Sequence, residues 1–150
     1  MKKIIAGILI FSFLIFSGCS LFEDRVISSL GRYESCEYFT SGGFKDYTDY
    51  AKYTYKDITF RNNQYFNKIS SKSKEDLMAH IENFESWIEI IKESDNKNDV
   101  ILGYDFDTSI ISENDYLYIY DDPDYDEFGN YNIYFFDMES NILYFFHTDV

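Results

Sequence analysis

The spacing of hydrophobic residues predicts one long helix in the middle of the chain. Five apolar residues recur there at intervals of three and four: Leu77, Ile81, Phe84, Ile88 and Ile91. This spacing forms a continuous stripe on one face of an α-helix. Ser73, followed three positions later by Asp76, has the pattern of a capping box at the start of the helix, and the polar run 94–99 ends it.

Two shorter helices are expected nearer the start of the chain. Phe22, Val26 and Leu30 are spaced by four and are followed by Gly31, a pattern typical of a short helix. After Gly42, a second helix is predicted over residues 44–56. Its apolar residues at helical spacing are Phe44, Tyr47, Tyr50, Ala51, Tyr55 and Ile58.

The last fifty residues change to short runs rich in aromatic and β-branched residues, which favour strands. The runs are 104–107, 116–120, 131–136 and 142–147, and turn-forming residues separate them. The last two runs are joined by DMESN and should form a hairpin. The fold class expected is α+β: two main helices followed by a four-stranded antiparallel β-meander, with the helices packed on one face of the sheet.

The first nineteen residues have the pattern of a bacterial lipoprotein signal. Lys2 and Lys3 precede an apolar run over 4–16, which is shorter than the 18 or more residues that a spanning helix needs. The run ends in FSGC (16–19), which resembles the lipobox of lipoproteins, with Phe16 where that motif most often has Leu. The resemblance implies cleavage between Gly18 and Cys19 and a diacylglyceryl group on Cys19, an essentially permanent anchor. A plain secretory signal or an uncleaved anchor are the alternatives.

The expected organisation is therefore a signal peptide over 1–18, the lipidated cysteine and a tether over 19–42, and a single domain over 43–150. The protein should lie on the extracytoplasmic side of the cell membrane or of an outer membrane. The aromatic content, 21% of the chain, is far above that of disordered chains and indicates a folded core.

Charge limits the partners that this domain can have. The formal net charge is −14, and removal of Lys2 and Lys3 with the signal leaves eleven basic against twenty-seven acidic residues, a net charge of −16. Such a field repels nucleic acids and anionic lipid headgroups and attracts cations and basic proteins. We expect no nucleic acid partner.

Three segments carry a resemblance to a known family: GFKDYTDYAKY (43–53), ENFESWIE (82–89) and YNIYFFDMESNILYFFH (131–147). Together they resemble a family of small uncharacterised proteins of low-GC bacteria, some of them lipoproteins. The likeness spans most of residues 43–150 and consists of aromatic packing patterns. It implies an α+β fold and brings no activity or functional residue with it.

An acidic loop is the first candidate site. Asp122, Asp124 and Asp126 are spaced like the first ligands of an EF-hand loop. The pattern then fails, because Glu127 stands where the loop needs Gly, and Ile133 stands where it needs a bidentate Glu. Weak Ca²⁺ binding and a solvated acidic hairpin loop both remain open, and the second is favoured.

A row of tyrosines is the second candidate. Tyr116, Tyr118 and Tyr120 fall on one face of a predicted strand, where aromatic rings could stack on a sugar or bind a protein. The alternative is that they cover a core beneath a helix, with their hydroxyl groups at its margin.

The sequence supports a catalytic site less well than it supports either of these two candidate binding sites. With Cys19 lipidated, Cys36 is the one remaining thiol, so no intramolecular disulfide framework is expected, and no known cysteine-enzyme motif surrounds it. His80 and His147, its conceivable partners, both lie on aromatic elements expected to pack in the core. A glycosidase-like carboxylate pair could be sought among the acidic residues Asp105, Asp107, Asp137 and Glu139, but chance pairs are expected in so acidic a chain.

The sequence thus predicts a membrane-anchored extracytoplasmic lipoprotein that is not an enzyme and has no cofactor beyond weakly bound Ca²⁺. A protein-interaction module with a basic protein partner is favoured, and a Ca²⁺- or glycan-binding envelope module is the alternative.

Overall fold

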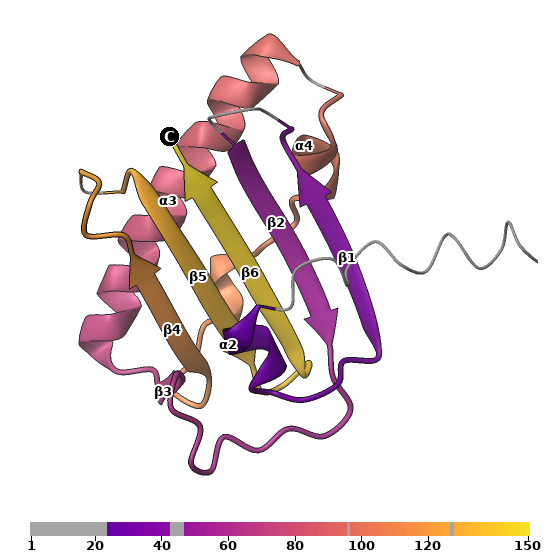
Figure 1. Ribbon diagram of the computed structural model, residues 1–150, viewed down its shortest axis with the longest axis vertical. Helices are drawn as coiled ribbons and strands as arrows, with labels where there is room; N and C mark the ends of the chain where they lie inside the picture. Colours follow the sequence, from indigo (N-terminus) through magenta and orange to yellow (C-terminus); the bar gives the residue numbers. More distant parts are fainter. Residues whose placement is uncertain (1–23, 43–46, 96, 127) are drawn as a thin grey trace, which may run out of the picture.

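The protein folds around one six-stranded antiparallel sheet, seen in a computed structural model that describes residues 24–42, 47–95, 97–126 and 128–150 (Figure 1). The elements in chain order are α2 (Arg25–Ser28), β1 (Ser35–Thr40), β2 (Tyr47–Thr54), β3 (Asn67–Lys68), α3 (Ser71–Ser94), α4 (Asp99–Gly103), the 3₁₀ turn η1 (Thr108–Ile110), β4 (Tyr116–Asp121), β5 (Asn130–Asp137) and β6 (Ile142–Asp149). The strand order is β1-β2-β6-β5-β4-β3. Strand β6 therefore lies between β2 and β5.

The hairpin of β5 and β6 forms the centre of the sheet and confirms the hairpin expected around DMESN. Asn130 pairs with Asp149 and Asp137 with Ile142, so the two strands are in register over their full length. Asn141 has a φ of 58° in the turn between them, a left-handed conformation that Asn tolerates better than most residues. The Asp137 carboxylate accepts the N–H of Glu139 and the hydroxyl of Ser140, which closes the turn.

One long helix, α3, covers the rear face of the sheet in the view of Figure 1. Ser70 is its N-cap and forms a capping box with Ser73, so Ser73 lies inside the first turn and is not the cap expected from the sequence. The predicted stripe is confirmed, since Leu77, Ile81 and Phe84 are fully buried. They pack against rear-face residues of the central strands and form the larger of two hydrophobic clusters.

The front face of the sheet carries the second cluster. The short helix α2, capped by the Asp24 carboxylate, lies across this face and buries Val26 and Ile27. Leu30 follows them into the cluster, and Gly31 ends this segment with a φ of 85°. Segment 24–42, which was expected in the tether, thus contributes both a helix and the strand β1 to the fold.

The expected architecture of two main helices and a four-stranded meander was wrong. In place of the helix expected over 44–56, Tyr47–Thr54 is strand β2, paired on both sides with β1 and β6. Residues 104–107 join α4 to η1 outside the sheet, and β1 and β3 were not anticipated. The protein is α+β, but its sheet has six strands and is packed on both faces.

Within the part of the chain that the structure describes, no helix has the length and apolar character needed to cross a bilayer.

Candidate functional site

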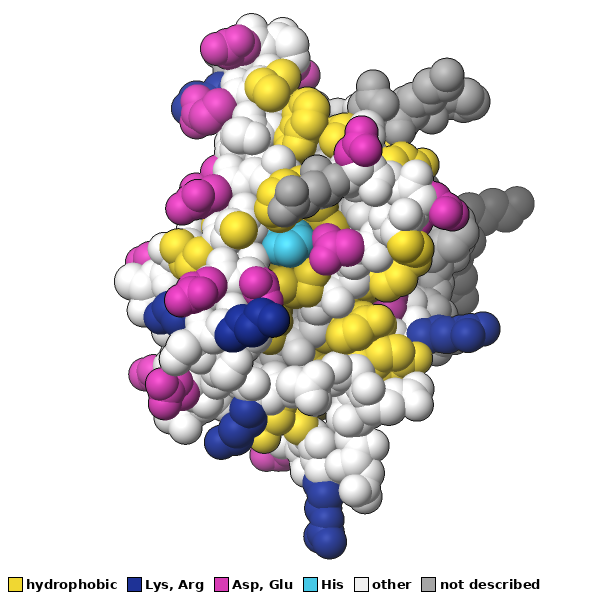
Figure 2. Space-filling view, turned by 90° about the vertical axis from the view of Figure 1, so that its left-hand side faces the viewer, with side chains coloured by type: hydrophobic (Ala, Val, Ile, Leu, Met, Phe, Trp, Pro, Cys, Tyr) yellow, Lys and Arg dark blue, Asp and Glu magenta, His cyan; other side chains and the backbone are white. Residues whose placement is uncertain are grey.

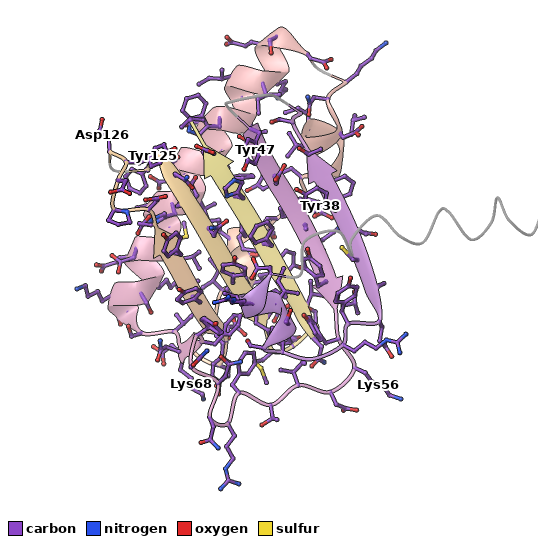
Figure 3. All side chains as sticks on the ribbon, in the orientation of Figure 1. Tyr38, Tyr47, Lys56, Lys68, Tyr125 and Asp126 are labelled. Atoms are coloured by element: carbon purple, nitrogen blue, oxygen red, sulfur yellow. The ribbon has the colours of Figure 1, made fainter. Side chains whose placement is uncertain are left out.

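A pocket lies on the front face of the sheet beside α2, and Ile27 of that helix and its N-cap Asp24 contribute to the lining. Its volume is about 360 Å³, and strands β1, β2, β5 and β6 supply most of its lining. Successive side chains of a strand point to opposite faces, so Tyr47, Asp49 and Tyr53 of β2 all face the pocket while Tyr50 faces α3. Figure 3 shows Tyr38 and Tyr47 on the front face.

Asp49 and His147 form the polar floor of the pocket. They are directly paired across β2 and β6. Asp49 is only 5% exposed, and its Oδ2 accepts a hydrogen bond of 2.6 Å from the Tyr38 hydroxyl. The other oxygen, Oδ1, is buried and has no hydrogen-bond partner among the described residues. The floor therefore holds a buried acceptor that the fold leaves unsatisfied.

His147 presents a second unsatisfied atom. Its Nδ1 lies 2.8 Å from Oδ1 of Asn132, while its buried Nε2 has no hydrogen-bond partner among the described residues. Burial lowers the pKa of His147 below its ordinary value, although the Asp49 carboxylate and the Tyr131 backbone act in the opposite direction. A neutral ring whose Nδ1–H donates to Asn132 carries a bare lone pair on Nε2.

Tyrosines form the walls and stay protonated. Burial raises the pKa of Tyr38, and its hydrogen bond to Asp49 raises the pKa further. The pKa of Tyr47 is also raised, first by burial and then by the carboxylates of Asp149 and Asp49. The Tyr47 ring lies 4.9 Å from that of His147, centroid to centroid. The walls therefore offer neutral aromatic faces.

The described lining of the pocket is acidic. Asp24 joins Asp49 among the described residues of the lining, none of which is Lys or Arg. The ion pairs among the described residues involve Lys52, His80 and Lys92 and none reaches Asp49. The labelled side chains of Lys56 and Lys68 lie at the opposite end of the sheet from Tyr47 (Figure 3).

The predicted tyrosine row is divided between packing and exposure. Tyr116 stacks on Phe60, with ring centroids 3.9 Å apart, and Tyr118 packs against Tyr65 and Tyr134. Tyr120, the last of the three, is 43% exposed. Two of the three rings thus help to cover the second cluster, and a binding role for the row stays a prediction.

The acidic loop between β4 and β5 shows no convergence on an ion. Asp122 Oδ1 accepts the backbone N–H of Asp124 in a local turn, and Asp126 lies at the outer tip of the loop (Figure 3). Across the described ranges, no three His, Cys, Asp or Glu side chains are grouped so that they could hold a metal ion. Weak Ca²⁺ binding by Asp122, Asp124 and Asp126 stays a prediction, without a preformed cage to support it.

His80 lies in a separate groove of about 600 Å³ between α3 and the β4–β5 loop. Its Nδ1 donates to the carbonyl of Asp76 at 2.8 Å, and its Nε2 lies 2.8 Å from Oδ1 of Asp121. Acidic side chains are spread over this side of the molecule among exposed hydrophobic ones (Figure 2). Because both ring nitrogens of His80 are engaged within the fold, this groove lacks the unsatisfied atoms of the front-face pocket.

Three of the other candidate carboxylates, those of Asp105, Asp107 and Asp137, accept hydrogen bonds within the fold. Asp105 accepts hydrogen bonds from Tyr50 at 2.8 Å and from Lys52 at 2.7 Å. Burial alone would raise the pKa of Asp105, but these two donors hold it below its usual value. Asp107 caps η1 and Asp137 closes the β5–β6 turn, with Glu139 donating its N–H to that carboxylate. A glycosidase-like pair among these residues stays a hypothesis from the sequence.

Of the two cysteines, the structure describes only Cys36. Cys36 lies half-buried on β1 beside the second cluster and is not a free thiol, contrary to the expectation from the sequence. Cys19, with the cleavage site at Gly18, lies outside the described residues, so lipidation stays a prediction. The pocket residues Asp49 and Asn132 were missed entirely, because the strand β2 is buried on both faces and shows no clear alternation of polar and apolar residues.

Comparison of the chain with protein-family models, with curated proteins and with solved structures gave no match.

Proposed function

We propose that this protein is a lipid-anchored, extracytoplasmic binding protein of the bacterial envelope, and that it acts by docking a basic protein on the front face of its sheet. The observation that carries the proposal is the pocket of Asp49, His147, Tyr38 and Tyr47, which combines aromatic walls with an unpaired buried carboxylate. Aromatic anchors in a concave surface commonly dominate the energy of protein interfaces. The net negative charge would accelerate the approach of a basic partner.

A non-enzymatic role fits the chemistry of this pocket better than catalysis. Covalent catalysis needs a nucleophile beside a base. Asp49 and His147 could act as a carboxylate and a base, but the described residues of the pocket lining include no Ser, Thr or Cys. The tyrosine hydroxyl groups are poor nucleophiles here, because burial raises the pKa of both Tyr38 and Tyr47.

The test compares two exposed tyrosines of the same sheet face. Tyr38 is 44% exposed beside the pocket, and Tyr120 is 43% exposed on β4, away from it. Lipidated protein in detergent is used to capture partners from envelope extract, which are identified by mass spectrometry. We expect a basic protein that is retained by wild type and by Tyr120→Ala, and lost with Tyr38→Ala. Its association rate should fall as ionic strength rises.

Two results would contradict the proposal. If the captured protein is acidic, or if Tyr38→Ala and Tyr120→Ala retain it equally, the front-face pocket does not bind it. If the association rate is insensitive to salt, electrostatic attraction of a basic partner is not its basis.

Glycan binding is the second candidate, and it is favoured by the two buried acceptors that lack donors among the described residues, Oδ1 of Asp49 and Nε2 of His147. Sugar hydroxyl groups can donate to buried carboxylate and imidazole acceptors, and sugar rings stack on tyrosines. Binding of a neutral oligosaccharide should barely respond to ionic strength, so the same salt series separates the two functions.

A further inference from the structure

We infer that the front-face pocket receives an arginine side chain of the partner protein, whose guanidinium group donates hydrogen bonds to Oδ1 of Asp49 and Nε2 of His147. This inference rests on the proposed function and specifies the chemistry of recognition at the same pocket.

Hydrogen bonding at the floor of the pocket calls for a donor group. Oδ1 of Asp49 is a pure acceptor, and Nε2 of His147 is an acceptor when Nδ1–H donates to Asn132. Both atoms are buried, and neither has a donor among the described residues. Buried acceptors without donors destabilise a fold, and such atoms in a native protein commonly mark a site that a ligand completes. The missing group must therefore bring at least two donors.

The charge of the pocket floor favours a cation. Asp49 is only 5% exposed, and it has no ion-pair partner among the described residues. Asp24 also lines the pocket, and the Asp149 carboxylate acts on Tyr47 at its margin. A buried carboxylate favours a paired cation. A cationic donor thus satisfies this floor better than a neutral hydroxyl group.

A guanidinium group fits this floor better than an ammonium group does. Its plane carries five N–H donors in a fixed fork, so one group can serve two acceptors on neighbouring strands. The same plane stacks on aromatic rings, and Tyr47, whose ring adjoins that of His147, supplies such a surface. An ammonium group offers a point charge with neither the fork nor the stacking plane.

The experiment uses a fluorescein-labelled tetra-arginine peptide as the probe and tetra-citrulline, its neutral isostere, as the control. Both are titrated into the mature lipidated chain in detergent, and fluorescence anisotropy gives the Kd. Asp49→Asn removes the charge but keeps an oxygen that can accept the Tyr38 hydroxyl. The matched variant Asp57→Asn makes the same change of net charge at an exposed position of the loop after β2.

We expect the tetra-arginine peptide to bind wild type and the citrulline peptide not to bind. Asp49→Asn should weaken binding by about tenfold or more, and Asp57→Asn by less than about twofold, because only Asp49 meets the guanidinium directly. His147→Gln should weaken binding as well. Urea denaturation of each variant establishes that it is folded, and His147→Gln carries the test if Asp49→Asn does not fold.

Equal weakening by Asp49→Asn and Asp57→Asn would mean that the general negative field binds the peptide, and would overturn the inference. Equal binding of the citrulline peptide would also overturn it. The proposed function is judged separately: a basic envelope protein retained by Asp49→Asn but lost with Tyr38→Ala would leave that function standing and remove only the arginine site. Failure of wild type to retain any basic protein would instead remove the proposed function.

Discussion

Replacing Phe84 by alanine should be among the most destabilising single changes in this protein. Phe84 is fully buried on the sheet-facing side of α3. Its ring lies 5.2 Å from that of Phe146, edge to face, and 5.6 Å from that of Tyr104. The truncation removes most of an aromatic side chain from the space between helix and sheet, and substitutions of this kind cost about 3–5 kcal/mol. Single domains are stable by only about 5–15 kcal/mol in total.

Urea denaturation followed by circular dichroism measures this loss. With an m-value of about 2 kcal/mol per M, a loss of about 4 kcal/mol lowers the midpoint by about 2 M. Ile90→Ala is the control on the same helix, because Ile90 is 52% exposed and its replacement should change stability by less than about 0.5 kcal/mol. Equal midpoints for wild type and Phe84→Ala would refute the packing of α3 on the sheet.

Three further predictions address the site, the loop and the anchor. Burial lowers the pKa of His147, so the imidazole takes up a proton more readily in the unfolded chain than in the folded protein. The free energy of unfolding should therefore fall as the pH drops from about 7.5 to about 5.5, through the ordinary histidine range. His147→Gln should show a shallower fall in a urea series over the same pH range, and a steeper fall would contradict the sign of this shift. If Asp122, Asp124 and Asp126 bind Ca²⁺, millimolar Ca²⁺ should raise the melting temperature of wild type but not of the variant with Asn at all three positions, whereas equal shifts would indicate charge screening alone. Wild-type protein should partition into detergent and show by intact mass the loss of residues 1–18 and a diacylglyceryl adduct, while Cys19→Ala should remain in the aqueous phase; wild type that retains Met1 would exclude lipoprotein processing.

The long helix could be predicted because α3 buries only one side. Its exposed faces are polar, so the stripe from Leu77 to Ile88 keeps the helical period undisturbed. The β5–β6 hairpin could be predicted because a short segment of turn-forming residues separates two runs of aromatic residues.

Strand β2 was misread because it is buried on both faces. Tyr50 faces the cluster under α3 and Ala51 faces the second cluster, and both are fully buried. Apolar residues at 47, 50 and 51 then imitate the spacing of a helix, and the alternation typical of a half-exposed strand is lost. Strand β1 was missed for the opposite reason, since it is a mostly exposed edge strand of polar composition.

The candidate site could not be derived from local patterns. Asp49 and His147 are far apart in the chain and meet only because β6 pairs with β2. Each residue alone is unremarkable in an acidic, aromatic-rich sequence. Their significance comes from the unsatisfied atoms Oδ1 and Nε2, which only the packed structure reveals.

The central position of β6 also determines when the protein can fold. The strand that joins the β1–β2 pair to the β5–β4–β3 side is the last one in chain order. Until residues 142–149 have been made, these two parts share no backbone pairing, and β2 must then find a partner that is distant in sequence. Such non-local closure is entropically expensive and slows folding. An emerging chain should therefore be unable to complete this sheet before residues 142–149 are available to pair with both β2 and β5.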